Sequence, residues 1–236
     1  MKKLLVLLVL ALMLCLALAS CGGNEGSTPE TTLPETTVAP APLEFGSEAA
    51  YAYVYGVTGI GEFTGTDLVI PQKSAEGKTV GCIYSDAFKD CSNLKTITLP
   101  SSIRGNFDTF EGCTSLESFF VSDENSEFVA IEGVLYRNRS MLIKLERYPA
   151  AKAGTTYTVP ETVEYIGECA FEGSLYLTEI TLPATLESVE DCAFANCAAL
   201  RTIRFGGTMA QWESINMDNW RENLAGCSVI CSDGTL

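Results

Sequence analysis

The sequence contains no histidine, and basic residues are scarce: 15 Lys and Arg stand against 30 Asp and Glu. Without imidazole, the chain cannot run a Ser-His-Asp or Cys-His mechanism, and it lacks the commonest zinc ligand. The formal net charge of −15 argues against nucleic acid as a partner, because binding to phosphate requires clustered Lys and Arg. With 47% hydrophobic residues in 236, the chain nevertheless has the composition of a folded protein.

The first 20 residues have the charge order of a secretory signal peptide. Lys2 and Lys3 precede sixteen apolar residues, 4–19, which fall short of the roughly 20 that a membrane-spanning helix needs. Residues 18–21, Leu-Ala-Ser-Cys, resemble the lipobox of bacterial lipoproteins. This resemblance implies cleavage before Cys21 and lipidation of its sulfur, hence an extracytoplasmic protein that contacts the membrane through a lipid anchor. An ordinary secreted protein with a free Cys21 is the alternative.

A linker is expected after Cys21. Residues 22–43 hold four of the nine prolines, five threonines and no basic residue, and they show no apolar period. Such a composition cannot bury a core and favours extended backbone. We therefore predict a disordered, lipid-anchored linker over residues 21–47 and a folded domain over residues 48–236.

The remainder of the chain repeats with a period near 23. An aromatic residue is followed by a small residue at +3, Leu at +6, Ile or Phe at +9 and an aliphatic residue at +11. Copies start at Phe88, Phe110, Phe171 and Phe194. The +9 to +11 stretches alternate like short strands, and one unit cannot bury its apolar side alone. The pattern predicts a solenoid of short parallel β-strands with short helical or 3₁₀ corners.

The residues of these copies, for example 87–103, resemble the BspA-type leucine-rich repeat, which is found on bacterial surface proteins. Residues 125–163 are similar to the hairpin-bearing unit of that family, and residues 207–215 with 231–234 are similar to its closing segment. The resemblance covers residues 50–236. It implies a leucine-rich-repeat solenoid that recognises proteins or other cells at the cell surface.

One interruption and one cap are expected in the solenoid. Val121 and Val159 are equivalent strand ends but lie 38 residues apart, so an insertion at about 122–157 should form a hairpin. We expect its strands at residues 134–136 and 141–143 and its turn at 138–140. At the other end, Thr208 and Gln211 have the spacing of a capping box, which predicts a short helix within a cap over residues 206–236. Trp212 should seal the last turn; a ligand-stacking role is its alternative.

Eight cysteines remain beyond Cys15 and Cys21. Cys91, Cys113 and Cys197 share the +3 position, which indicates small core residues. Two disulfides are open alternatives to free thiols, because the members of each pair could lie close together. The pairs are Cys169 with Cys192 and Cys227 with Cys231. No C-x-x-C motif, phosphate-binding loop or other cofactor motif is present, so we predict neither a metal site nor a cofactor.

Carboxylate pairs such as Glu161 with Glu164, or Glu187 with Glu190, could serve as the acid and base of a glycosidase. Thirty acidic residues produce such pairs by accident, and these occupy positions that should face water. We therefore predict no catalytic residues and no enzyme.

A binding face is expected on the outward side of the repeated strands, where solenoids present an extended surface. Phe120 stands out, because the equivalent residues in other copies are Thr98, Thr181 and Arg204. It is either an exposed anchor or a residue packed under the hairpin. The predicted binding face consists of Lys95, Thr98, Glu117, Phe120, Glu179, Thr181, Arg201 and Arg204.

The sequence thus predicts a lipid-anchored, cell-surface leucine-rich-repeat protein that binds a protein or another cell-surface ligand or mediates adhesion. A lipoprotein that captures peptides or glycans is the first alternative, and it would need a pocket with several exposed aromatics. A carboxylate-based hydrolase is the second, and it would need converging carboxylates with raised pKa values. A passive spacer protein also remains open.

Overall fold

The computed structural model describes residues 43–47, 54–105, 110–139, 142–217 and 226–236. These residues form a β-solenoid of about seven turns, as the repeat predicted. One strand of each turn contributes to the surface that we call the ladder face. The ladder strands are β3 (Asp67–Val69), β5 (Thr96–Leu99), β6 (Ser118–Val121), β10 (Thr156–Thr158), β12 (Glu179–Leu182), β14 (Thr202–Phe205) and β16 (Ser228–Cys231).

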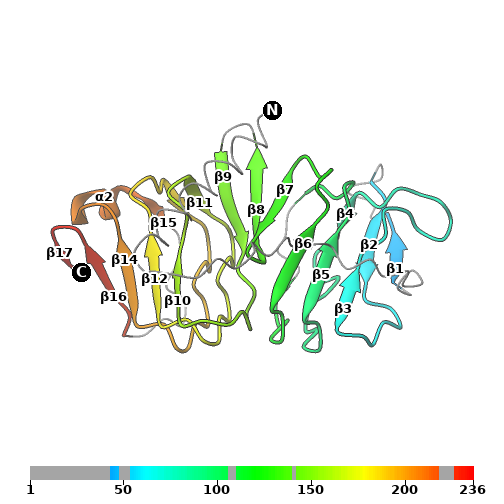
Figure 1. The fold of residues 1–236 in the computed structure, drawn as a ribbon, viewed down its shortest axis with the longest axis horizontal. Coiled ribbons are helices and arrows are strands. Elements are labelled where there is room, and N and C mark those ends of the chain that lie inside the picture. The colour runs from blue at the N-terminus through cyan, green and yellow to red at the C-terminus, as the bar shows by residue number, and fades with distance from the viewer. Residues whose placement is uncertain (1–42, 48–53, 106–109, 140–141, 218–225) are drawn as a thin grey trace, which may run out of the picture. The chain divides into compact units, whose positions relative to one another are not determined.

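A second set of strands covers the opposite side of the solenoid (Figure 1). Most of these strands are only two to four residues long, since each turn of about 23 residues must also form its corners. The second set consists of β1 (Glu44–Gly46), β2 (Gly56–Gly59), β4 (Cys82–Ile83), β7 (Phe128–Ile131), β8 (Val134–Arg139), β9 (Leu142–Arg147), β11 (Val163–Ile166), β13 (Ser188–Val189) and β15 (Asn216–Met217).

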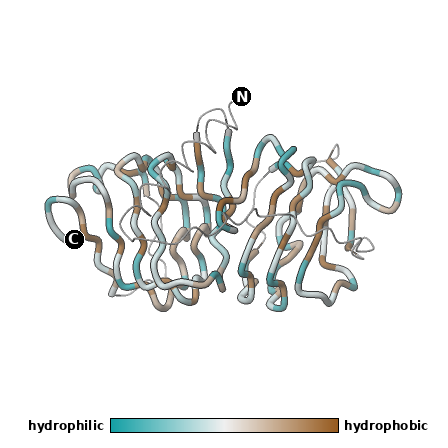
Figure 2. The backbone as a smooth tube through the Cα atoms, viewed as in Figure 1, coloured by the Kyte–Doolittle hydropathy of each residue, from teal (hydrophilic) through white to brown (hydrophobic). Residues whose placement is uncertain are grey.

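The core is a stack of equivalent apolar residues. In the parallel register, Ile180 pairs with Ile203 and Ile203 with Val229, and all three are fully buried. Each turn therefore covers the apolar residues of the next, and hydrophobic residues recur from turn to turn along the stack (Figure 2).

The corners are successive tight turns. Cys91 N–H donates to Phe88 O at 3.2 Å, and Leu94 N–H donates to Cys91 O at 3.1 Å. These hydrogen bonds span three residues, as in a 3₁₀ helix, but the turns do not join into a continuous helix. The second residue after each repeat phenylalanine has a left-handed backbone with φ between 56° and 75°, which suits Gly, Asn and Asp. The residues at this position are Asp90, Gly112, Gly173 and Asn196.

A column of aromatic rings runs through the corners. Phe88 stacks on Phe110 with 5.8 Å between the ring centroids, and Phe171 stacks on Phe194 at 5.2 Å. Tyr148 stacks on Phe171 at 5.4 Å, so it is the aromatic residue of the interrupted turn. The repeat pattern in the sequence did not place Tyr148 among the repeat phenylalanines.

The predicted hairpin is present as β8 and β9, but its strands are longer than expected. Arg139 pairs with Leu142, so the predicted turn residues Asn138 and Arg139 belong to β8. A third strand, β7, pairs antiparallel with β8 around Gly133. The turn at Gly133 lies against the ladder, where Phe119 N–H donates to Gly133 O at 2.9 Å. As a result, the ladder consists of two sheets, β3-β5-β6 and β10-β12-β14-β16, the second extended by β17 (Gly234–Thr235).

Three tyrosines pack together under the hairpin. The hydroxyl groups of Tyr136 and Tyr157 are hydrogen bonded, and the ring of Tyr148 meets that of Tyr157 edge-on at 4.9 Å. Burial raises the pKa of Tyr148 to about 12 and raises the pKa values of Tyr136 and Tyr157 above their ordinary range. The folded state therefore favours the neutral phenols.

These phenols make alkaline stability a testable property. Because their pKa values are raised on folding, their contribution is complete below pH about 10, the ordinary phenol pKa. It is lost as the pH rises toward the folded values, which begin at about 12 for Tyr148. We expect their phenolate absorbance at 295 nm to appear together with unfolding, whereas in urea all tyrosines should titrate near pH 10. Ionisation of all tyrosines near pH 10 in the folded protein would contradict the buried cluster.

The C-terminal cap agrees with the prediction. Helix α2 (Met209–Ser214) begins with the capping box: Thr208 Oγ1 accepts from Gln211 N–H, and Gln211 Oε1 accepts from Thr208 N–H. Trp212 is 4% exposed and meets Phe205 at 5.3 Å, so it closes the core.

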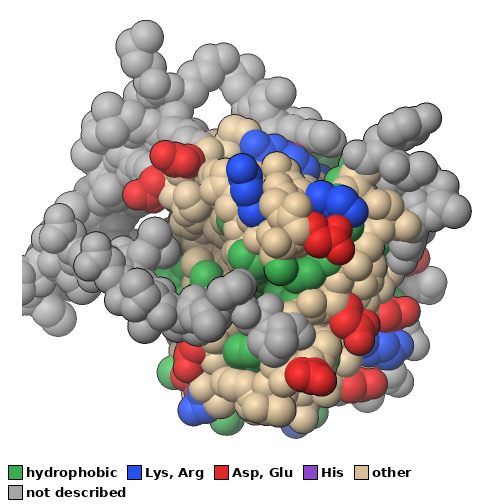
Figure 3. Space-filling model, turned by 90° about the vertical axis from the view of Figure 1, so that its right-hand side faces the viewer, with side chains coloured by type: hydrophobic (Ala, Val, Ile, Leu, Met, Phe, Trp, Pro, Cys, Tyr) green, Lys and Arg blue, Asp and Glu red, His purple; other side chains and the backbone are tan. Residues whose placement is uncertain are grey.

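The N-terminal boundary of the domain differs from the prediction. Strand β1 pairs antiparallel with β2, and Leu43 is buried, so residues 43–46 belong to the fold although the linker was expected to extend to residue 47. The signal peptide, Cys21 and the rest of the linker lie outside the described residues. The end of the solenoid formed by β1–β4 shows hydrophobic side chains among charged ones (Figure 3). No helix in the described part of the chain is long and apolar enough to cross a membrane.

Candidate functional site: the ladder face and the pocket beside it

The ladder face presents two columns of outward side chains. In the first column, Thr96 pairs with Ser118 on one sheet, and Glu179 pairs with Thr202 on the other. In the second column, Thr98 pairs with Phe120 and Thr181 pairs with Arg204. In each sheet, the residues that the alternation of apolar and polar positions places outward therefore lie in the same two columns.

Four of the five charged residues of the predicted binding face form ion pairs across turns. Lys95 lies 3.3 Å from Glu117, and Arg204 lies 2.9 Å from Glu179. The guanidinium of Arg201, which is exposed, donates to the carbonyl oxygens of Ala198 and Leu200. Thr98 and Thr181 are half-buried within their strands.

Phe120 is half-buried, and it lies on β6, the strand next to the inserted hairpin. The same strand receives the Gly133 turn at its N-terminal end, where Ser118 Oγ fills the space above Gly133. Phe120 therefore remains partly accessible, which lies between the two alternatives given by the sequence. It is neither a fully exposed anchor nor a core residue.

Both members of one acidic pair considered for hydrolysis, Glu187 and Glu190, are tied to other groups. Glu190 forms an ion pair with Lys144 at 2.7 Å, and Glu187 accepts a hydrogen bond from Tyr165 Oη at 2.8 Å. The buried carboxylate of Glu146 has its pKa raised by burial, but it lies 2.5 Å from Arg137. These contacts are those of a packed surface and a buried ion pair.

Two of the three +3 cysteines donate to the carbonyl of the preceding repeat phenylalanine. Cys113 Sγ donates to Phe88 O at 3.1 Å, and Cys197 Sγ donates to Phe171 O at 3.0 Å. Burial raises the pKa of Cys113 to about 12 and that of Cys197 to about 11, which keeps both thiols protonated. Each thiol therefore ties its own turn to the carbonyl of the preceding repeat phenylalanine.

The two disulfides that the sequence left open are not formed in this structure, in which Cys169 and Cys231 are free thiols. Cys169 and Cys192 do occupy equivalent positions in consecutive turns, with φ angles of 52° and 54°. The pairing of these cysteines stays a prediction. Among the residues that the structure describes, no group of three or more Cys, Asp and Glu side chains is arranged to hold a metal ion.

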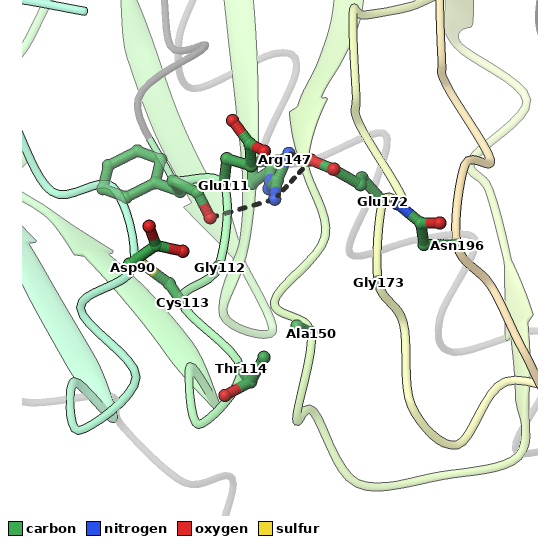
Figure 4. Close-up of a pocket in the computed structure, with 11 residues that line it drawn as sticks. Asp90, Glu111, Gly112, Cys113, Thr114, Arg147, Ala150, Glu172, Gly173 and Asn196 are labelled. Carbon is green, nitrogen blue, oxygen red and sulfur yellow. Dashed lines mark hydrogen bonds and ion pairs between the residues drawn. The ribbon is translucent and has the colours of Figure 1, made fainter. Parts of the chain in front are cut away.

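A pocket of about 240 Å³ lies at the corner edge of the solenoid, where the repeat is interrupted (Figure 4). The sequence analysis missed it. Five segments far apart in the chain form its walls, and Arg147 points into the space between them. The polar side chains that line it are Asp90, Glu111, Thr114, Arg147, Glu172 and Asn196.

The interruption explains why the pocket and Arg147 occur together. In the turn that begins with Tyr148, the +3 residue is Ala151, which has no side-chain donor for the carbonyl of Phe110. Arg147 takes over this role: its Nη2 donates to Phe110 O at 3.1 Å. The same guanidinium donates to Cys169 O and lies 3.4 Å from Glu172, so it joins the turns on both sides. The signal in the sequence was an arginine beside Tyr148, the aromatic residue of a turn that has Ala rather than Cys or Ser at +3.

The fold and its repeated surface define a leucine-rich-repeat solenoid protein. The sequence matches the family model of the BspA type leucine rich repeat region, in six copies, over residues 66–146 and 150–219. The chain therefore belongs to the BspA-type leucine-rich-repeat family, as its residues suggested. This membership points to a non-enzymatic repeat protein with a protein-binding surface. A comparison with the curated proteins finds no match.

Solved structures of bacterial proteins share similarity with the chain. A leucine-rich repeat protein from Eubacterium ventriosum is 21% identical with a TM-score of 0.48, over 70% of this chain and 54% of that one. TpLRR, a leucine-rich repeat protein of T. pallidum, is 18% identical with a TM-score of 0.45, over 82% and 81% of the two chains. The pneumococcal vaccine antigen PcpA is 27% identical with a TM-score of 0.45, over 56% and 34%. The chain spans about half the length of the Eubacterium protein.

Proposed function

We propose that this protein is a binding or adhesion module held outside the cytoplasm by a lipid on Cys21, that its ladder face contacts a partner protein, and that it catalyses no reaction. The leader with its lipobox-like Leu-Ala-Ser-Cys sequence supports the location. Two acyl chains on one cysteine provide stable anchoring, and the Pro- and Thr-rich segment after it provides the distance from the membrane.

The observation that carries the proposal is the charge balance of the ladder face. The whole chain has a formal net charge of −15 and therefore repels anionic surfaces. On the predicted binding face, by contrast, four of the five charged side chains form ion pairs, Lys95 with Glu117 and Glu179 with Arg204. A partner can approach this face closely, because little charge has to be desolvated without a counterpart. Thr98, Thr181 and the accessible part of Phe120 then supply hydrogen-bonding and apolar contacts.

Site-specific photo-crosslinking on intact cells tests this assignment. A photoreactive phenylalanine analogue at Thr181 should crosslink one defined protein, whereas the analogue at Ser188, on the opposite strand β13, should not. The crosslinked product should also carry biotin from a membrane-impermeant reagent added to the cells. In the protein that carries the photoreactive residue at position 181, the added substitution Phe120→Thr should weaken the interaction about tenfold, because it removes a moderate interface anchor.

Phe120→Thr copies the residue found at the equivalent positions of β5 and β12, so it preserves the strand. Glu164→Gln, on the opposite side of the solenoid, is the matched control and should leave the yield unchanged. Equal crosslinking from Thr181 and Ser188, or a product that is not biotinylated, would contradict the proposal.

A further inference from the structure

Arg201 is the fifth charged residue of the predicted binding face, and the described part of the chain shows no ion-pair partner for it, whereas the other four form two ion pairs. Its guanidinium is nevertheless held in place, because Nη1 donates to Ala198 O at 2.8 Å and to Leu200 O at 2.9 Å. These two hydrogen bonds use the two donors of Nη1. The remaining donors of the guanidinium, on Nε and Nη2, have no partner among the residues that the structure describes.

Two other arginines show what the Nε side of a guanidinium pairs with in this protein. Arg104 forms the same local hydrogen bonds, from Nη1 to the carbonyl oxygens three residues and one residue before it. Its Nε lies 3.8 Å from a carboxylate oxygen of Glu127. The Nε of Arg204 lies 2.9 Å from a carboxylate oxygen of Glu179. A carboxylate is therefore the group that matches the open Nε and Nη2 side of Arg201, where it can accept two parallel hydrogen bonds.

Two exposed apolar side chains lie in the turn that precedes Arg201. Leu175 is 44% exposed and Tyr176 is 51% exposed. The equivalent positions of the other turns hold polar residues or alanine, namely Ser92, Asn93, Thr114, Ser115, Lys152, Ala153, Ala198 and Ala199. The repeat therefore does not need large apolar side chains at these positions for its core. Exposed side chains of this kind, and tyrosine in particular, are typical of interface anchors.

Backbone hydrogen bonds place Arg201 beside these apolar side chains. Arg201 N–H donates to Thr178 O at 2.9 Å, so the two segments run side by side, about 4.8 Å apart as in a parallel sheet. The strands that follow keep the same pairing, so Leu175 lies opposite Ala198. Because the guanidinium of Arg201 folds back onto Ala198 O, its open side belongs to the same surface as the exposed apolar pair.

We infer that this surface receives an acidic segment of the partner protein, in which a carboxylate pairs with Nε and Nη2 of Arg201 and a neighbouring apolar side chain packs on Leu175 and Tyr176. The inference rests on the proposed protein-binding function and adds the chemistry of one contact. Residues 172–179 and 196–204 contain two acidic side chains, Glu172 and Glu179, and each forms an ion pair with an arginine. The surface therefore complements a negative charge, although the chain as a whole is acidic.

The full-length protein and short peptides test the inference without any partner. N-acetyl-Leu-Glu-Leu amide should shift the Nε–H signal of Arg201 in a ¹⁵N NMR spectrum, whereas the isosteric N-acetyl-Leu-Gln-Leu amide should bind at least tenfold more weakly. N-acetyl-Gly-Glu-Gly amide should also bind more weakly, because it lacks the apolar contacts with Leu175 and Tyr176. Arg201→Gln should reduce the affinity for the first peptide about tenfold, and Tyr176→Ser should reduce it about threefold.

Both variants should fold like the parent protein, because Arg201 and Tyr176 are exposed. Lys73→Gln, at an exposed position between β3 and β4, removes the same charge elsewhere and should leave the affinity unchanged. Equal affinities for the Glu and Gln peptides, or an unchanged affinity in Arg201→Gln, would overturn the inference.

Two further results would assign the site to another occupant and would also overturn the inference. Inorganic phosphate that binds as tightly as the Leu-Glu-Leu peptide would indicate a site for free anions. An Arg201 Nε–H signal that shifts with the concentration of the protein alone would indicate a second copy of the chain. The titration is independent of the crosslinking result, so the failure of one is distinguishable from the failure of the other.

Discussion

Replacement of Phe171 by alanine is expected to lower the free energy of unfolding by about 3–5 kcal/mol, the range for removal of a fully buried aromatic side chain. Phe171 is the middle ring of the column and stacks on Tyr148 on one side and on Phe194 on the other. Its loss leaves a cavity between two turns and removes both ring contacts. Urea unfolding followed by far-UV circular dichroism measures the effect.

The exposed Tyr176, five residues further along the same turn, provides the control. It is 51% exposed, so Tyr176→Ala should change the stability by less than about 0.5 kcal/mol. Phe171→Leu should lie between the two, because leucine fills part of the space and keeps the site apolar. A loss of less than 1 kcal/mol in Phe171→Ala would show that the aromatic column does not hold the turns together.

Periodicity made the regular turns predictable. Residues such as Ile97, Ile180 and Ile203 recur at the same offset from each phenylalanine, and all are fully buried in the structure. A period of 23 residues has one simple physical solution, in which each turn buries the apolar side of the next. The outward positions followed from strand alternation, and the structure arranges Thr98, Thr181 and their equivalents as predicted.

The interrupted turn was less predictable, because there the residues depart from the repeat. Tyr148 fills the aromatic position, but its turn has Gly154 in place of Leu at +6 and Tyr157 in place of Ile or Phe at +9, so its equivalence emerges from stacking on Phe171. Strand β7 was missed because Phe128, Val129, Ala130 and Ile131 form a short apolar run without alternation. The end of the linker was misplaced for a related reason: β1 is three residues long and is defined by its pairing with β2.

The spacing of residues in the sequence does not predict the pocket. It arises because the Tyr148 turn does not complete the corner that its neighbours share, and its walls come from five segments that lie at least 20 residues apart. The Cys113 and Cys197 hydrogen bonds provide the clue in retrospect. Phe110 O accepts one hydrogen bond from Cys113 N–H at 3.2 Å, and Arg147 Nη2 supplies the second hydrogen bond that the Phe88 and Phe171 carbonyls receive from cysteine thiols. An arginine at that point is the compensation.

Arg147→Ala is accordingly expected to destabilise the protein by about 3 kcal/mol. The substitution removes a buried guanidinium from Glu172 and from the carbonyl oxygens of Phe110 and Cys169, and breaking a buried pair by deleting one partner typically costs about 3–5 kcal/mol. The lower end is expected because Glu172 is near the pocket and can regain water. Urea unfolding of the variant and the parent protein measures the difference.

Arg201→Ala is a closely matched control. The Arg201 guanidinium also donates to two carbonyl oxygens, at 2.8 and 2.9 Å, but the residue is exposed, so water can replace it at a cost of less than about 0.5 kcal/mol. Arg147→Lys retains the charge but lacks the two terminal guanidinium nitrogens that reach both neighbouring turns. It should therefore recover only part of the lost free energy of unfolding. If Arg147→Ala and Arg201→Ala were equally mild, the interrupted turn would be held by the Tyr148 stack alone. A large effect confined to Arg147 would identify the guanidinium as the link that carries the solenoid across its interruption.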